Sequence, residues 1–148
     1  MMGGVSLISL DSKGRLAIPA RHREVLLATF GHKLVVTLES SDHLLMYPES
    51  NWRAVEARLL ALPTGNPTLK HYQRLVLGHA ETLEMDSAGR VLLPARLRAL
   101  TGLDKEVALV GMGNRFELWN SVEWEEQTRV ALEIGQAELA VHLGDFTL

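Results

Sequence analysis

The chain has 148 residues, 47% of them hydrophobic and none of them cysteine, and its formal net charge is −3. Without cysteine, disulfide bonds and thiolate metal sites are excluded, and no apolar stretch approaches the ~20 residues that a membrane helix needs. The amino-terminal residues lack the basic and apolar regions of a signal peptide, so we expect a cytoplasmic globular protein of one domain or two small intertwined ones.

The charge is distributed unevenly along the chain. Residues 1–78 carry nine Lys and Arg against six Asp and Glu, whereas residues 79–148 carry six against twelve. From Glu117 onward there are seven acids and a single base, Arg129. We therefore expect any DNA-binding surface to be a local patch rather than a field of the whole molecule.

An internal repeat organises the sequence. The segment 11–23 reads DSKGRLAIPARHR and recurs at 86–98 as DSAGRVLLPARLR, with eight of the thirteen positions identical. This repeat predicts two copies of one unit, at residues 5–51 and 80–123. A spacer at 52–79 would separate the copies, and a tail at 124–148 would follow them.

Each copy opens with a tight turn of the form Asp-Ser-x-Gly, in which Gly14 and Gly89 accept a positive φ. Apolar residues alternate on both sides of the turn, which predicts a β-hairpin with one buried face. That face would be formed by Ile8, Leu10, Leu16 and Ile18 in the first copy and by Leu83, Met85, Val91 and Leu93 in the second. Arg15 and Arg90 then fall on the opposite, outward face beside the turn.

A short helix and two more strands complete each copy. Pro19 and Pro94 mark the starts of the helices, because proline suits the first helical turn, and Gly31 and Gly102 mark their ends. Further strands are predicted at 34–38 and 44–47 in the first copy and at 107–110 and 116–119 in the second. The unit is therefore β-β-α-β-β, and the fold class is α+β.

The spacer and the tail are predicted to be helical. In the spacer, two apolar stripes on either side of the Pro-Thr-Gly-Asn-Pro segment 63–67 indicate a helical hairpin. In the tail, Val130, Ile134, Ala137 and Val141 form a stripe on an acidic helix, although Gly135 weakens its continuity. The sequence leaves open whether this helix packs on its own chain or on a neighbouring subunit.

The chain resembles the MraZ family, whose members carry two SpoVT-AbrB-like modules, each with a D-x-x-x-R signature. Here the signatures are Asp11 to Arg15 and Asp86 to Arg90, each followed by Pro-Ala-Arg, and the resemblance covers nearly the whole chain. It implies tandem modules interleaved as a swapped-hairpin β-barrel pseudo-dimer with flanking helices.

The resemblance also implies a function. Chains of this family would assemble into ring-shaped homo-oligomers on the nucleoid and bind short direct repeats in DNA. These repeats would lie upstream of the division and cell-wall gene cluster, at the protein's own promoter, where the rings would regulate transcription.

Arg15 and Arg90 are the foremost candidates for DNA contact. A guanidinium fork can donate parallel hydrogen bonds to phosphate or reach guanine O6 and N7 in the major groove. Two alternatives remain open, namely an ion pair with Asp11 or Asp86 that pins the turn, and a subunit contact. Contact and pairing are compatible, because a carboxylate can orient a guanidinium.

A second set of cations surrounds the first. Lys13, at the tip of the turn, either meets phosphate or is simply solvated, and its replacement by alanine in the second copy indicates unequal DNA contacts. Arg21 and Arg96 lie in a first helical turn, where the helix dipole disfavours cations. Arg23 and Arg98 lie about 200° further around the helix, so one arginine of each pair should face elsewhere. DNA contact and pairing within the protein are both open for these four.

Two rival functions are less well supported. An enzyme is not expected, because no phosphate-loop or nucleophile motif occurs and the six histidines show no metal-binding spacing. We therefore expect no cofactor, no metal, no small-molecule substrate and no membrane partner. An antitoxin-like or scaffolding interaction module is the alternative, although such antitoxins carry one module and a disordered tail. The three tryptophans are interpreted as core or interface residues.

Overall fold

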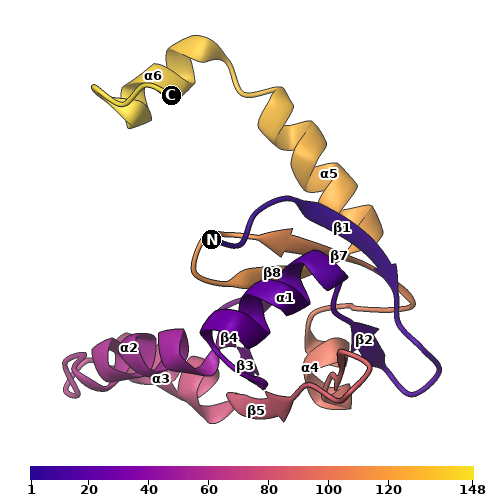
Figure 1. Ribbon diagram of the computed structural model, residues 1–148. Helices are drawn as coiled ribbons and strands as arrows, with labels where there is room; N and C mark the ends of the chain where they lie inside the picture. The colour runs from indigo at the N-terminus through magenta and orange to yellow at the C-terminus, as the bar shows by residue number, and fades with distance from the viewer.

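The computed structural model describes all residues, Met1–Leu148, and has a mixed α+β architecture with six helices and a mostly antiparallel sheet (Figure 1). The first copy contains β1 (Val5–Ser9), β2 (Arg15–Ala17), α1 (Ala20–Thr29), β3 (Lys33–Thr37) and β4 (Leu44–Pro48). The spacer forms α2 (Glu49–Leu60) and α3 (Pro67–Gly78). The second copy contains β5 (Glu81–Glu84), β6 (Arg90–Leu92), α4 (Ala95–Leu100), β7 (Glu106–Gly111) and β8 (Phe116–Asn120), and the tail forms α5 (Ser121–Leu132) and α6 (Gln136–Leu143). The β-β-α-β-β order predicted for each copy is confirmed.

The strands of the two copies pair with each other. Six of them form one sheet in the order β1-β7-β8-β4-β3-β5, and the other two, β2 and β6, form a separate ribbon. The pairs β1–β7, β2–β6, β5–β3 and β4–β8 all join one copy to the other. The predicted hairpin within each copy is therefore wrong, because β1 does not pair with β2 and β5 does not pair with β6.

The strand register shows that the two copies are related by an approximate two-fold symmetry. In the ribbon, Leu16 lies opposite Val91, which is the same position of the repeat in the other copy. In the sheet, Leu45 lies opposite Glu117, which is again its equivalent. Because equivalent positions face each other at both places, the two copies pack as a pseudo-symmetric pair.

One hydrophobic core unites the two copies. It holds nineteen buried residues, of which ten come from residues 2–46 and nine from residues 85–118. Six of the eight side chains predicted to face inward around the turns belong to this core, and Ile8 and Leu83 pack against it. The predicted buried face is thus confirmed, although the strands that carry it find their partners in the other copy.

The spacer is a helical hairpin, as predicted. Helices α2 and α3 lie side by side (Figure 1), and the Gln73 side chain of α3 donates a 2.6 Å hydrogen bond to the carbonyl oxygen of Leu59 on α2. Trp52, Leu59 and Val76 pack in a second cluster against outward-facing residues of β3 and β4. The hairpin therefore covers the face of these strands that the main core leaves free.

The tail differs from the single helix that was predicted. It breaks into α5 and α6, with Gly135 at the amino-terminal boundary of α6, because an extended glycine there stops the helical path. Helix α5 contacts β7 and β8, whereas α6 lies away from the rest of the molecule (Figure 1). The apolar side chains Val130, Ile134 and Val141 are exposed. None of the six helices has the length and apolarity needed to cross a membrane.

Candidate nucleic-acid interface

The turn of the first copy is held together by the Asp11 carboxylate. Its Oδ1 accepts hydrogen bonds of 2.9 Å from the backbone N–H groups of Lys13 and Arg15, and its Oδ2 accepts a 2.6 Å bond from Arg15 Nε. Gly14, with a φ of +85°, donates its N–H to the Asp11 carbonyl oxygen. One side chain thus shapes the turn and also orients the guanidinium.

The turn of the second copy repeats this arrangement. Asp86 Oδ1 accepts bonds of 2.9 Å from the N–H groups of Ala88 and Arg90, and Oδ2 accepts a 3.2 Å bond from Arg90 Nε. Gly89 has a φ of +75°. The predicted turn chemistry is therefore present in both copies, and both aspartate–arginine pairs form.

These hydrogen bonds change the acidity of the two aspartates. The backbone N–H of Arg15 makes the largest contribution in lowering the pKa of Asp11, from an ordinary 3.8 to about 2. The pKa of Asp86 is lowered for the same reason, chiefly by the N–H of Arg90. Both carboxylates therefore remain charged, and stay bonded to their turns, at neutral pH.

We expect the Asp11 carboxyl to titrate near pH 2 in carbon-detected NMR. Because its pKa is lower in the folded than in the unfolded chain, its contribution to stability is complete above about pH 4 and is lost as the pH falls toward 2. An Arg15→Ala variant keeps the backbone N–H donors, so it should raise this pKa only partly. Full recovery of the Asp11 pKa to 3.8 in that variant would show that the Arg15 side chain, and not the backbone N–H groups, is the main cause of the lowered pKa.

The ribbon presents both arginines on one surface. Leu16 and Val91 point into the core, so alternation places Arg15 and Arg90 on the opposite face. In the register, Arg15 lies opposite Leu92, two residues from Arg90, a diagonal that spans about 7–8 Å between Cα atoms. The two arginines therefore lie on the same face of the ribbon, on neighbouring strands.

Both guanidinium groups have unused donors. Relative exposure is 33% for the Arg15 side chain and 40% for that of Arg90. Only Nε of each group is hydrogen-bonded within the chain, which leaves the two terminal nitrogens without a partner. Pairing with aspartate and contact with an outside anion are thus compatible in this geometry.

The remaining cations differ in their surroundings. Lys13 is exposed at the tip of its turn. Arg21 is exposed and donates a 2.9 Å bond to the Ser6 hydroxyl, and Arg96 is exposed without a hydrogen-bond partner in the chain. Arg23 and Arg98 are half-buried and donate to backbone carbonyls. The structure places Arg15 and Arg90 on one face of the ribbon and Lys13 at the tip of the first turn, and it directs the Arg23 and Arg98 side chains to backbone carbonyls.

One residue of this face was missed by the sequence analysis. Leu92 is 55% exposed and lies on the outward face of the ribbon, directly opposite Arg15. The equivalent position in the first copy is Ala17, opposite Arg90. The sequence held the signal for Leu92, because strand alternation around Val91 places its neighbours outward. The difference between Leu92 and Ala17 makes the two halves of the face unequal.

The comparisons with known proteins agree on one family. A sequence model of a family described as "MraZ protein", with the addition "antitoxin-like", matches residues 1–75 and 76–142. A Chromobacterium violaceum protein named "Transcriptional regulator MraZ" is 83% identical over 148 residues, which is all of both chains. Proteins of the same name from Neisseria meningitidis and Thiobacillus denitrificans are 50% and 46% identical, and each match spans all of this chain and at least 99% of the relative.

Proposed function

The chain belongs to the MraZ family, and we propose that it is a sequence-specific DNA-binding regulator of transcription that is not an enzyme and uses no cofactor. The observation that carries this proposal is the outward face of the β2–β6 ribbon, where Arg15 and Arg90 present free terminal nitrogens. The names of the curated relatives, each a transcriptional regulator, support it.

The β2–β6 ribbon is a two-stranded element of the kind that a DNA groove can admit. A major groove about 12 Å wide admits a two-stranded β-ribbon, and an arginine fork there meets guanine O6 and N7 or a flanking phosphate. Lys13, at the tip, would contact phosphate as a point charge. Leu92 would meet an apolar base edge such as the thymine methyl group. Because Ala88 and Ala17 replace these two residues in the other half, the two halves would read different bases.

Assembly is the second part of the proposal. One chain offers about two to five phosphate contacts, which alone give weak and salt-sensitive binding. A ring-shaped homo-oligomer on short direct repeats would raise avidity about 10²–10⁴-fold. The exposed apolar residues of α5 and α6 support self-association, because they have no partner in a single chain. The repeats would lie upstream of the division and cell-wall gene cluster, at the gene's own promoter, and the protein would act on the nucleoid in the cytoplasm.

The architecture proposed for this function is the swapped-hairpin barrel of the family. Four strand pairs that cross between the copies support it. Within it, residues 5–51 and 80–123 are the two SpoVT-AbrB-like modules. Residues 52–79 are the helical spacer between them, and residues 124–148 are the helical tail.

Binding of the full chain to the DNA upstream of its own gene tests this proposal. Fluorescence anisotropy between about 50 and 200 mM salt should show the logarithm of the affinity falling with the logarithm of salt, by about 0.9 per phosphate contact. Specific DNA should bind at least about 10³-fold more tightly than a shuffled sequence, and light scattering of the same sample should give the mass of an oligomer. Equal affinity for specific and shuffled DNA would contradict the proposal.

A further inference from the structure

Each copy sends an arginine from its helix onto the turn of the other copy. Arg23, on α1 of the first copy, donates a 3.2 Å hydrogen bond from Nη1 to the carbonyl oxygen of Ala88 in the second turn. Arg98, on α4 of the second copy, lies against Gly14 of the first turn. Its Nε donates a 3.2 Å bond to the carbonyl oxygen of Leu93. The two arginines are equivalent in the repeat, so an arginine packs against the turn of the other copy twice, whereas the hydrogen bond to that turn is made by Arg23 alone.

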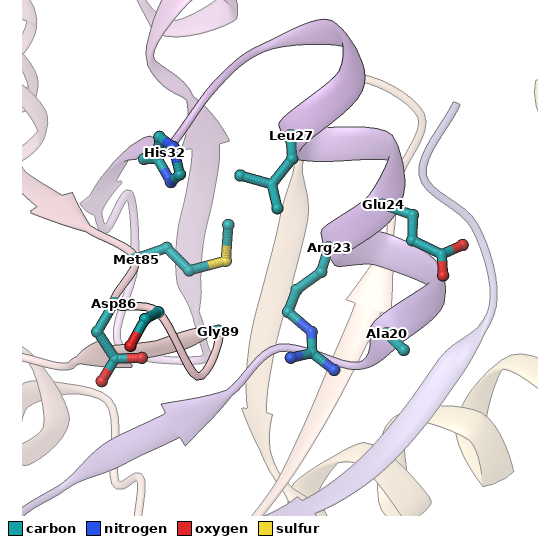
Figure 2. A pocket seen from close by; sticks show the side chains of 9 residues that line it. Ala20, Arg23, Glu24, Leu27, His32, Met85, Asp86 and Gly89 are labelled. Atoms are coloured by element: carbon teal, nitrogen blue, oxygen red, sulfur yellow. The ribbon is translucent and has the colours of Figure 1, made fainter.

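The arginine side chains occupy the space beside the turn glycines. A Cβ built on Gly89 would overlap Cδ of Arg23, and a Cβ built on Gly14 would overlap the guanidinium of Arg98. Figure 2 shows Arg23 extending from α1 toward the turn that contains Asp86 and Gly89, along one wall of a cavity of about 250 Å³. Each turn therefore packs directly on an arginine that the other copy supplies.

Backbone hydrogen bonds tie the same places together. Ile18 donates its N–H to the Gly89 carbonyl oxygen at 2.9 Å, and Leu93 donates to that of Gly14 at 3.1 Å. These bonds fix the glycine of each turn to the other copy, and the arginine side chain packs against the same glycine. Removing the arginine side chain should therefore loosen the turn residues whose N–H groups donate hydrogen bonds to Asp11 or Asp86.

We propose that Arg23 and Arg98 are positioning residues that act across the duplication. Arg23 holds the turn that orients Arg90, and Arg98 holds the turn that orients Arg15. This inference rests on the proposed function only in the step from turn geometry to DNA affinity. It contrasts with the sequence-based alternative in which both arginines touch DNA themselves.

Hydrogen exchange of the free protein, read by mass spectrometry, tests the crossed contact without DNA. Arg23→Ala should raise exchange about fivefold in the turn 86–90, the effect of one lost hydrogen bond, and leave the turn 11–15 unchanged. Arg98→Ala, which removes packing against Gly14 rather than a hydrogen bond to the turn, should raise exchange in the turn 11–15 and leave the turn 86–90 unchanged. Arg21→Ala and Arg96→Ala, which remove the same charge two positions earlier, are the matched controls and should change neither turn. Faster exchange in the turn of the variant's own copy, or in both turns equally, would overturn the proposal.

DNA affinity provides a second readout through double-mutant cycles. Arg23→Ala combined with Arg90→Ala should be non-additive, with a coupling of about 2- to 150-fold, whereas Arg23→Ala with Arg15→Ala should be additive. Arg23→Lys keeps a long stem and a donor, so it should restore most of the affinity and retain the fold if the alanine variant unfolds. Additive losses for Arg23 and Arg90 would refute the positioning role. If the unmodified chain binds no specific DNA, the proposed function fails, while the exchange result still decides the crossed contact.

Discussion

Replacing both Arg15 and Arg90 with alanine is expected to abolish specific DNA binding while leaving the fold intact. Each arginine should contribute about 1–3 kcal/mol, so each single variant loses about 5- to 150-fold in affinity. The double variant should lose about 2–6 kcal/mol per chain if the effects add. An assembly that presents several chains to one promoter multiplies this loss, because avidity depends on every contact.

The fold should survive because neither side chain supports the core. Both arginines are partly exposed, and the Asp11 and Asp86 carboxylates keep their backbone donors when the guanidinium groups are removed. Thermal unfolding of the variant should therefore stay within a few degrees of the parent chain, the usual outcome for surface substitutions.

A matched control separates local contact from total charge. Arg129 lies on α5 and pairs with Glu126 and Glu133, so Arg129→Ala removes one positive charge outside the ribbon. It should leave affinity for specific DNA nearly unchanged. Arg15→Lys keeps the charge but lacks the planar fork, so it should recover non-specific binding better than sequence discrimination. Undiminished binding in a gel shift with both ribbon arginines removed would refute the assignment of this face.

Local features of this chain were predictable from its sequence because local physics determines them. The turn of Asp11 and Gly14 follows from an aspartate that caps its own backbone and a glycine that adopts a positive φ. The end of α1 two residues before Gly31, which has a φ of +92°, follows from the same property of glycine. Alternation around the turns predicted which side chains are buried, and it placed Arg15 on the outward side.

Strand partners were not predictable by the same reasoning. Alternation of apolar residues states which face of a strand is buried but not which strand lies beside it. A local hairpin and an exchange between copies bury Leu16 and Val91 equally well, so only the structure distinguishes them. The contacts of Arg23 and Arg98 escaped prediction for this reason, because each depends on a turn about 65 or more residues away.

The exchange of strands leads to the second large expectation, which concerns folding. If the chain is divided in the α2–α3 loop, between Thr64 and Gly65, neither fragment should fold as a monomer. Strands β1, β2 and β4 would lose partners that lie in the other fragment, and the nineteen-residue core would separate into ten and nine residues. Burial of one large apolar side chain stabilises a fold by about 1.5–3 kcal/mol. The free energy lost when several such side chains become exposed therefore exceeds a net stability of about 5–15 kcal/mol.

Mixing the fragments 1–64 and 65–148 in equal amounts should restore a folded pair with cooperative unfolding in circular dichroism. Because the two copies are alike, one fragment could pair with itself, so each should also be measured over a range of concentrations, where self-pairing would disappear on dilution. A chain ending at residue 134 is the matched control, since it loses α6 but no strand and no core residue, and it should unfold at the temperature of the full chain. A folded monomer of either fragment, stable on dilution, would show that each copy completes its own core and that the crossed strand pairs are not required.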